Sequence, residues 1–247
     1  MAGLVLAARY LTIVPLGRSP AHEDAAVGRS AAWFPVVGLG IGLVIVVVER
    51  IAGRIFPTLL AALLTVTAWK LLTGGLHLDG LADCLDGLGG RDPDHRLRIM
   101  RDSRIGAFGA MGLILFLLLE VVALAELAPA LRWRALLVAP AVARAMPPLL
   151  ARWYPAARQN GQGAAFAAGV QPRAVPVALG VAGLAALAAL GPAGLVALAA
   201  AVVVAMAVAR FMTGRLGGIT GDVLGAGVET AELTVLLTMS AWVHGVR

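Results

Sequence analysis

Acidic residues, basic residues and glycines cluster between positions 73 and 106 of an otherwise apolar chain. Asp79, Asp83 and Asp86 follow one another there at helical spacing, so on a helix their carboxylates share one face. Three carboxylates on one stripe repel each other unless a cation lies between them. Hard divalent ions such as Mg²⁺ bind oxygen ligands, retain part of their water shell and pair with substrate phosphates. We therefore favour a phosphate-handling magnesium site over a solvated helix face.

Side chains of other types accompany these acids. His77 lies on the opposite face of the same helix from Asp79, where it is either a general base or a hydrogen-bonded interfacial histidine. Arg101 and Arg104 follow the acids, and arginine pairs with phosphate oxygens in a bidentate way. These two arginines are therefore candidates for binding a diphosphate opposite the acidic stripe.

A second polar segment, 217–232, has the same combination of a glycine turn followed by acids. Asp222 is either a helix N-cap or a fourth metal ligand. Glu229 stands further along an apolar helix, where an unpaired carboxylate is unfavourable and so indicates function. Arg144, in a proline-interrupted helix, needs an anionic partner from the protein or from a substrate. Arg158 lies in a glycine-rich segment that is either a substrate lid or an ordinary connection.

The composition indicates the elements that must position these residues. Of 247 residues, 60% are hydrophobic and 14% are charged, and the mean hydropathy of +0.89 is that of a membrane protein. The net charge of +6 does not indicate nucleic-acid binding, because the arginines are spread over loops between apolar segments. A single cysteine excludes an intrachain disulfide framework. We expect one integral membrane domain over residues 1–247, an all-α polytopic helical bundle.

The apolar segments predict about seven membrane crossings after an interfacial helix at residues 1–15. The Gly191-Pro192 pair must divide one long apolar run into two helices, and Lys70 is expected to reach from the end of its helix to the membrane interface. The expected spans are 30–48, 55–69, 105–119 extended through 126, 135–150, 174–190, 192–209 and a short last span, 233–246.

The distribution of basic residues predicts the orientation of this bundle. Most arginines fall on the side of the loops at 74–104, 151–173 and 213–229, and positively charged loops stay in the cytoplasm. These are also the loops with the polar motifs. We therefore expect a multi-pass protein of the cytoplasmic (inner) membrane whose active-site loops face the cytoplasm.

Several motifs together resemble the cobalamin synthase family, also called adenosylcobinamide-GDP ribazoletransferase. The resemblance rests on TGGLHLDGLADCLDGLGG at 73–90, on RIMRDSRIGAFG at 98–109 and on GGITGDVLGA at 217–226, with Glu229 and Glu232 following. It implies an integral membrane enzyme that joins α-ribazole, or its 5′-phosphate, to adenosylcobinamide-GDP through attack by the 5′-hydroxyl. GMP leaves, adenosylcobalamin or its phosphate forms, and Mg²⁺ is required.

The resemblance gives the candidate residues roles. Asp79, Asp83 and Asp86, with Asp222, would hold Mg²⁺ on the diphosphate, while Asp86, Asp102 and His77 compete as general base. The candidate substrate-binding residues are Arg101, Arg104, Arg144, Arg158 and Glu229. The partners implied are the two substrates, the lipid bilayer and, by conjecture, other enzymes of cobalamin assembly.

Two other classes compete with this interpretation. CDP-alcohol phosphatidyltransferases are membrane enzymes with similar Asp-Gly-rich helices, but Asp83 stands where they usually carry an arginine. An ion-coupled transporter would also explain a proline-broken bundle with Arg144 and Glu229. However, a transporter predicts polar residues at mid-membrane and paired repeats, and residues 174–209 contain neither.

Overall fold

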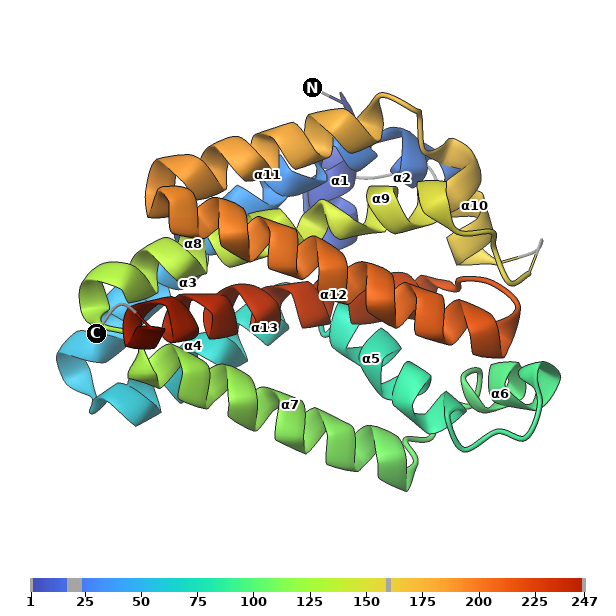
Figure 1. Ribbon diagram of the computed structural model, residues 1–247, viewed down its shortest axis with the longest axis horizontal. Coiled ribbons are helices and arrows are strands. Elements are labelled where there is room, and N and C mark those ends of the chain that lie inside the picture. The colour runs from blue at the N-terminus through green and yellow to red at the C-terminus, as the bar shows by residue number, and fades with distance from the viewer. Residues whose placement is uncertain (1, 17–23, 159–160, 246–247) are drawn as a thin grey trace.

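A computed structural model describes residues 2–16, 24–158 and 161–245 of the chain. Over these residues the protein is helical, and its only β-type contact is an isolated bridge between Ala156 and Ile219. The long helices lie side by side along the longest axis of the molecule (Figure 1). The expected all-α polytopic bundle is thus confirmed. Three predictions extend to residues outside this description. They are the start of the interfacial helix at residue 1, the middle of the 151–173 loop at residues 159–160, and the end of the last span at residue 246.

Five helical segments are long and apolar enough to cross a membrane, and two bent helix pairs raise the number to seven if each pair is one crossing. Three of the five are single helices: α7 (Ala107–Glu126), α12 (Pro192–Leu216) and α13 (Gly221–Gly245). The fourth is a 3-10 turn (Ala31–Trp33) continued by α3 (Phe34–Ile55), and the fifth is α8 (Pro129–Arg144) continued by α9 (Met146–Trp153). The pairs are α4 (Thr58–Leu72) with α5 (Leu76–Gly87), bent by 92°, and α10 (Gln162–Gly169) with α11 (Ala174–Leu190), bent by 89°.

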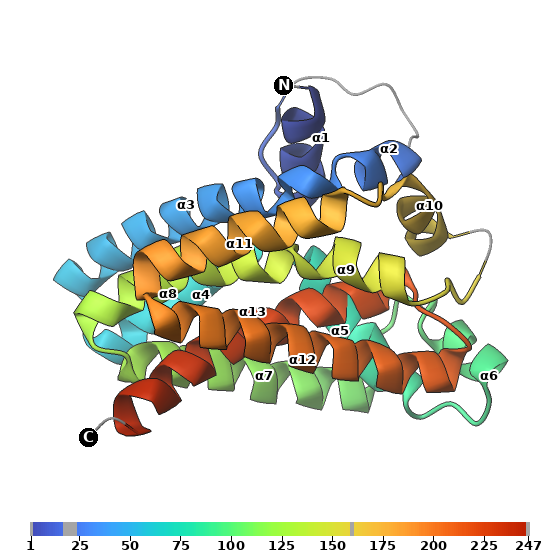
Figure 2. The same cartoon turned by 45° about the horizontal axis from the view of Figure 1, so that its top comes forward.

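Three short helices complete the fold: α1 (Ala2–Leu11), α2 (Asp24–Arg29) and α6 (Pro93–Ile99). α1 is apolar and stands across the direction of the long helices, as an interfacial helix would (Figure 2). α6, α10 and the end of α5 gather at one end of the bundle, where α13 begins (Figure 1). We call this the site end.

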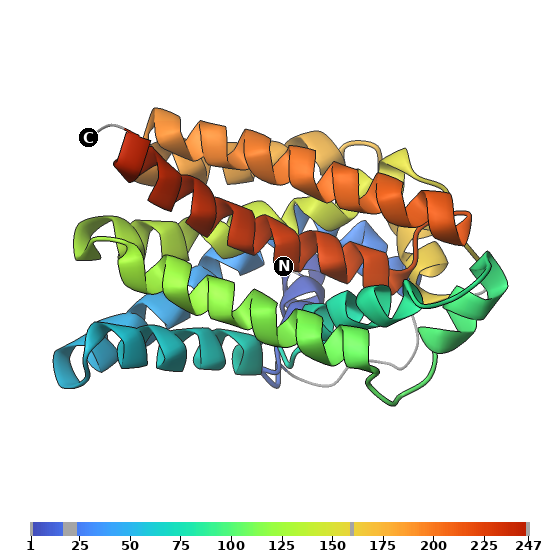
Figure 3. The same ribbon diagram turned by 60° about the horizontal axis from the view of Figure 1, so that its bottom comes forward.

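Small residues allow the long helices to pack closely. Ala197, Ala201, Ala205 and Ala209 recur every fourth residue along α12, are fully buried, and belong to a helix that packs against α13. Because lipid tails are as apolar as leucine, helices in a membrane associate through close van der Waals contact, which small residues permit. Figure 3 shows the other side of α13, where α7 runs alongside it and α4 lies beyond α7.

The predicted break between two helices at Gly191 occurs where expected, whereas the last helix begins earlier than predicted. Gly191 has a φ of +62°, a left-handed conformation that suits glycine, and it separates α11 from α12 as predicted. Gly74 and Gly75, with φ of +63° and +67°, turn the chain between α4 and α5. The short last span predicted from residue 233 was wrong, because α13 begins at Gly221 and contains Glu229 within it.

Candidate active site

Two glycines let α5 and α13 cross in close contact at the site end. A Cβ atom on Gly80 would lie 2.8 Å from both the Cα and the carbonyl oxygen of Asp222, closer than real side chains approach a backbone. Similarly, a Cβ on Gly225 would lie 3.2 Å from the Cα and carbonyl oxygen of His77. The glycines of both polar motifs therefore bring the start of α13 against the side of α5 formed by His77 and Gly80, next to Asp79.

This crossing gathers three carboxylates, Asp79, Asp83 and Asp222, which we call the acidic cluster. α5 is helical over the predicted stretch, so Asp79 and Asp83 stand one turn apart. Asp83 is partly buried and interacts electrostatically with Asp222, Asp79 and Asp86, all of the same charge. Oxygen donors in mutual repulsion fit a hard divalent cation, which would neutralise them. The donor set is thus chemically suited to Mg²⁺.

Asp222 is held in place by its own turn. The Thr220 hydroxyl donates a hydrogen bond to Asp222 Oδ2 at 3.1 Å and accepts one from the Val223 backbone N–H at 3.3 Å. Thr220 therefore occupies the capping position considered for Asp222, which leaves the Asp222 carboxylate directed into the site. Sequence reasoning did not single out Thr220, although a Thr-Gly-Asp sequence at a helix start indicates such a cap.

Asp86 has a different environment from its two predecessors on α5. Its two carboxylate oxygens accept hydrogen bonds from the backbone N–H groups of Gly106, at 2.7 Å, and Gly109, at 2.8 Å. These N–H groups lie at the beginning of α7 and have no partner within that helix. Asp86 therefore caps α7 and ties it to α5.

Three of the four predicted arginines, Arg101, Arg104 and Arg158, line two cavities at the site end. The acidic cavity, of about 1290 Å³ including its open part, is lined by Asp79 and Asp83 together with Arg101, Asp102 and Arg104. The arginine cavity, of about 840 Å³, is lined by Arg101, Arg158, Thr220 and Asp222. Arg101 lines both cavities, together with carboxylates of α5 in one and of α13 in the other.

Asp102 and Arg104 form an exposed pair within this lining. Arg104 donates through Nη2 to Asp102 Oδ2 at 2.6 Å and through Nε to Asp102 Oδ1 at 3.0 Å. These hydrogen bonds lower the pKa of Asp102 to about 2. A carboxylate with that pKa accepts a proton poorly near neutral pH, which argues against Asp102 as general base.

Arg158 is positioned by a contact between two loops. The Ala157 backbone N–H donates to the Ile219 carbonyl at 2.9 Å, and the Ile219 N–H donates to the Pro155 carbonyl at 2.8 Å. Arg158 itself donates to the Leu97 carbonyl at the end of α6, at 2.6 Å. Burial and then the positive charge of Arg101 lower the pKa of Arg158. Two neighbouring guanidinium groups of this kind suit an anionic ligand.

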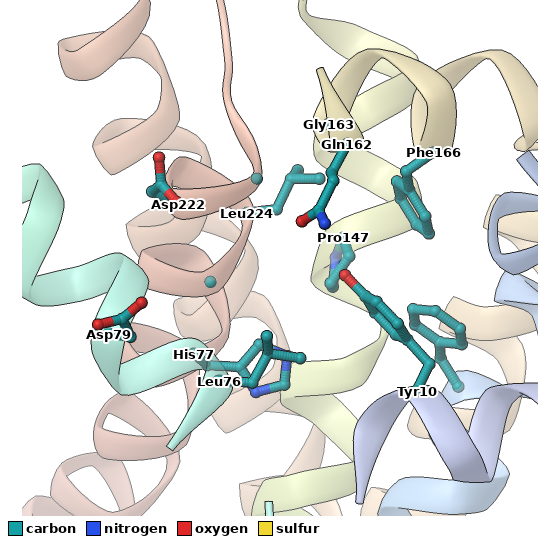
Figure 4. A pocket seen from close by; sticks show the side chains of 13 residues that line it. Tyr10, Leu76, His77, Asp79, Pro147, Gln162, Gly163, Phe166, Asp222 and Leu224 are labelled. Carbon is teal, nitrogen blue, oxygen red and sulfur yellow. The ribbon is translucent and has the colours of Figure 1, made fainter. Parts of the chain in front are cut away.

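His77 lines a third cavity, which also contains Asp79 and Asp222 (Figure 4). The side chain of His77 is buried, and its Nδ1 atom has no hydrogen-bond partner among the described residues. Its position beside Gly225 results from the same helix crossing that forms the acidic cluster.

The remaining two predicted residues, Arg144 and Glu229, belong to a buried ion-pair network inside the bundle. Lys70 Nζ lies 2.6 Å from Glu229, 2.9 Å from Glu232 and 3.0 Å from Glu120. Arg144 pairs with Glu232. The prediction that Lys70 reaches the membrane interface was wrong, because its ammonium group is surrounded by carboxylates from α7 and α13. Neither Arg144 nor Glu229 lines any of the three cavities.

Among the described residues, the compact trio of possible metal ligands is Glu120, Glu229 and Glu232, with one oxygen each within 4.8 Å of the others. The cation among them is the Lys70 ammonium, whose three N–H groups match three carboxylates. We therefore treat this trio as part of the ion-pair network. The acidic cluster is more open, which suits an ion that keeps water molecules and also binds substrate phosphate.

The Gly80→Ala variant is expected to separate α5 from α13 at the site. The added methyl group meets the Asp222 backbone, so the folded state should lose about 1–3 kcal/mol and turnover should fall. Thermal unfolding and activity of the detergent-purified protein measure both effects. Gly40→Ala is the matched control, because a Cβ there meets open space in α3. Equal behaviour of the two variants would contradict the close crossing.

Fold and site together define a polytopic membrane protein with a carboxylate- and arginine-lined site at one end of its bundle. The model of the cobalamin-5-phosphate synthase family matches residues 3–240. The chain therefore belongs to the cobalamin-5-phosphate synthase family, a family of transferases, and the resemblance in its motifs is confirmed.

Relatives named adenosylcobinamide-GDP ribazoletransferase match the chain over nearly its whole length. The protein of Bradyrhizobium diazoefficiens is 42% identical over 99% of this chain and 95% of its own length. Those of Herpetosiphon aurantiacus and Chlorobaculum tepidum are 40% and 38% identical, over 98% and 99% of this chain and 97% of their own lengths. No solved structure matches the chain.

Proposed function

We propose that this protein is an adenosylcobinamide-GDP ribazoletransferase that acts with Mg²⁺ at the acidic cluster. The observation that carries the proposal is that each of Asp79, Asp222 and Arg101 lines two of the three cavities at the site end, so carboxylates and a guanidinium group converge where these cavities adjoin. Phosphoryl-type transfer needs such groups, because charge on a diphosphate must be neutralised and the acceptor positioned. Full-length similarity to relatives that carry this name supports the same activity.

The reaction proposed is a displacement at the phosphate that links cobinamide to GMP. A ribose hydroxyl of α-ribazole, or of its 5′-phosphate, forms the new O–P bond, the bond to GMP breaks, and the hydroxyl proton passes to a base. The expectation that the 5′-hydroxyl attacks was wrong for a phosphorylated acceptor. The family description names a 5-phosphate product, and a phosphorylated 5′-oxygen has no hydroxyl to attack with. Another ribose hydroxyl must then be the nucleophile.

Asp79, Asp83 and Asp222 would hold the metal ion, with Asp86 engaged in capping α7. When bound, Mg²⁺ supplies positive charge to the diphosphate and lowers the repulsion that an incoming hydroxyl oxygen meets. Thr220 fixes the orientation of Asp222 for this task. The close crossing of α5 and α13 sets the separation of the carboxylates.

The arginines would bind the phosphates from the opposite side. Arg101 lines both the acidic and the arginine cavities, and Arg158 lines the latter, so the diphosphate would lie along their shared edge. Arg104 is exposed and turned towards Asp102, and would contact the substrate at the rim. Of the three candidate bases, Asp102 is too acidic and Asp86 caps α7, whereas His77 lines the cavity beside Asp79. His77 is thus the candidate placed to contact the acceptor.

We also propose that the site end faces the cytoplasm of a bacterial inner membrane. Arginines of α6 and of the loop after it lie at this end, in agreement with the preference of positive charge for the cytoplasmic side. Other enzymes of cobalamin assembly would then deliver substrates from the same side.

Purified protein should release GMP and form the corrinoid product only when adenosylcobinamide-GDP, α-ribazole 5′-phosphate and Mg²⁺ are all present, as followed by chromatography. Removal of Mg²⁺ with EDTA should stop the reaction and its re-addition restore it. Turnover of a CDP-lipid in a parallel reaction, or activity unchanged by EDTA, would contradict the proposal. Comparing sealed inside-out with right-side-out vesicles in the same assay reports the orientation, and activity in right-side-out vesicles alone would reverse it.

A further inference from the structure

The third cavity at the site end differs in character from the other two. It encloses about 700 Å³, including its open part, and we call it the aromatic cavity. In Figure 4 its acidic side carries Asp79 and Asp222, whereas Tyr10 and Phe166 stand on the opposite side. The rest of the lining includes Leu76, Pro147 and Leu224, which add apolar surface.

Three aromatic rings from distant parts of the chain form one wall of this cavity. Phe34, in α3, stacks on Tyr10 of α1 with ring centroids 6.1 Å apart, and on Phe166 of α10 with centroids 5.7 Å apart. The planes of the two pairs differ by only 22° and 30°. Phe34 and Phe166 are buried, while Tyr10 is 41% exposed. Tyr10 and Phe166 each turn one ring face to Phe34, so a flat ligand ring would stack on the other face of one of them.

The cavity also offers a polar atom without a partner. His77 is 5% exposed, lines the cavity, and its Nδ1 makes no hydrogen bond to the residues that the structure describes. A buried polar atom left in this state is unfavourable, and a ligand or water within the cavity would satisfy it. Gln162, also in the lining, extends its amide group into the same space (Figure 4).

We propose that the aromatic cavity binds the flat base of the acceptor nucleoside, the dimethylbenzimidazole ring of α-ribazole. This inference rests on the function proposed above. A base held between the ring wall and His77 places its ribose towards Asp79 and Asp222, which line the side of the same cavity opposite the rings. The ribose hydroxyl then lies beside the carboxylates that would hold the metal ion.

The chemistry of the lining favours this base over the guanine of the other substrate. Guanine presents a hydrogen-bonding edge and needs several donors and acceptors, whereas dimethylbenzimidazole has an apolar edge and few polar atoms. The aromatic cavity is lined by three aromatic rings and three aliphatic side chains, besides His77, Gln162 and the two aspartates. The arginine cavity has no aromatic ring in its lining among the described residues, and its two arginines, Arg101 and Arg158, make it the better place for the phosphates of the GDP portion.

The test is a comparison of KM values for the two substrates in Tyr10→Ala and Phe166→Ala proteins. Loss of stacking with a base should raise the KM for α-ribazole at least about tenfold in each variant. The KM for adenosylcobinamide-GDP should change less than about twofold. Phe108→Ala is the matched control, because Phe108 is 57% exposed on α7 and lies outside this cavity. Tyr10→Phe should stay near wild type, since the ring face is retained.

Direct binding separates this inference from the proposed function. Equilibrium dialysis with labelled α-ribazole should show binding to the wild-type protein and to Phe108→Ala, and weakened binding to Tyr10→Ala. That result supports the aromatic cavity as the base site even if the transfer reaction is not observed. A rise in the KM for adenosylcobinamide-GDP alone, or unchanged α-ribazole affinity in Tyr10→Ala, would overturn the assignment while leaving the transferase activity intact. Because Phe166 is buried and its truncation can disturb folding, the partly exposed Tyr10 keeps the test decisive.

Discussion

Replacing Asp83 by asparagine is expected to lower kcat about 10²–10³-fold while the protein stays folded and inserted. Asp83 stands on α5, where the negative charges of Asp222, Asp79 and Asp86 act on it. Asparagine keeps the shape of the side chain but removes the charge that would bind Mg²⁺. It also relieves the repulsion within the cluster, so the free protein should be as stable as the wild type or more stable. Turnover and thermal unfolding of the detergent-purified protein, each with and without Mg²⁺, measure the two effects.

Asp86→Asn is the matched control, because it changes the same side chain one turn further along the same helix. Its carboxylate caps α7, and an asparagine offers only one acceptor where two backbone N–H groups now bind. We therefore expect a stability loss of about 1 kcal/mol. Near-normal turnover in Asp83→Asn would remove that carboxylate from the metal site. A stability loss in Asp83→Asn as large as in Asp86→Asn would mean that Asp83 has a structural role instead.

The contrast between these two aspartates shows how far the sequence predicts the site. Helical periodicity correctly placed Asp79, Asp83 and Asp86 on one helix. It could not separate their environments, because the partners of Asp86 are backbone groups of Gly106 and Gly109, 20 and 23 residues away. Every residue except proline has a backbone N–H group, so the residue types do not show which of these groups will bind a carboxylate. The glycines of the RIMRDSRIGAFG motif were the available signal, since each leaves the space that the Asp86 carboxylate fills.

The sequence indicated that Asp222 could join the aspartates of α5 as a metal ligand, but it did not show that the two segments lie together. The two polar motifs share a pattern of glycines and acids, but spacing along the chain does not say that Gly80 and Gly225 form one crossing. Likewise, nothing in the local sequence around Tyr10 or Phe166 indicates that these rings meet at Phe34. Such contacts depend on how α1 and α10 pack against the bundle, which is a property of the tertiary structure.

The last helix shows why hydropathy alone misjudged one element. Glu229 and Glu232 made the first part of α13 look too polar to enter the bundle, so its span was expected to begin at residue 233. In the structure both carboxylates are neutralised by Lys70, and Glu232 also by Arg144. The signal that could have shown this is the balance of charges in apolar helices. Lys70 is the only lysine of the chain, and it occurs, like Arg144 and the three glutamates, within a predominantly apolar segment.

The ion-pair network also determines the second large expected effect. Lys70→Met, which keeps the length of the side chain and removes its charge, should destabilise the folded protein by about 3–5 kcal/mol. Three buried carboxylates, from Glu120, Glu229 and Glu232, would then face Arg144 alone. Lys70→Arg should not restore stability fully, because a planar guanidinium cannot place its donors as a compact ammonium does among three acceptors. Thermal unfolding in detergent and the yield of monodisperse protein measure the loss.

Arg54→Met supplies the control for the Lys70 variant, because it exchanges a cation for methionine at an exposed position near the end of α3 and should change stability by less than about 0.5 kcal/mol. If Lys70→Met proves too unstable to purify, a variant that also carries Glu120→Gln and Glu229→Gln should recover folded protein, since it removes charges that Lys70 had neutralised. Failure of this combined variant to improve on Lys70→Met, or wild-type stability of Lys70→Met itself, would mean that the glutamates do not depend on the ammonium group.

The ion-pair network also lies close to the site along the chain. Lys70 is in the last turn of α4, which leads through Gly74 and Gly75 to His77 and Asp79 on α5. The network therefore holds the start of α5 in place, and its loss should lower turnover as well as stability.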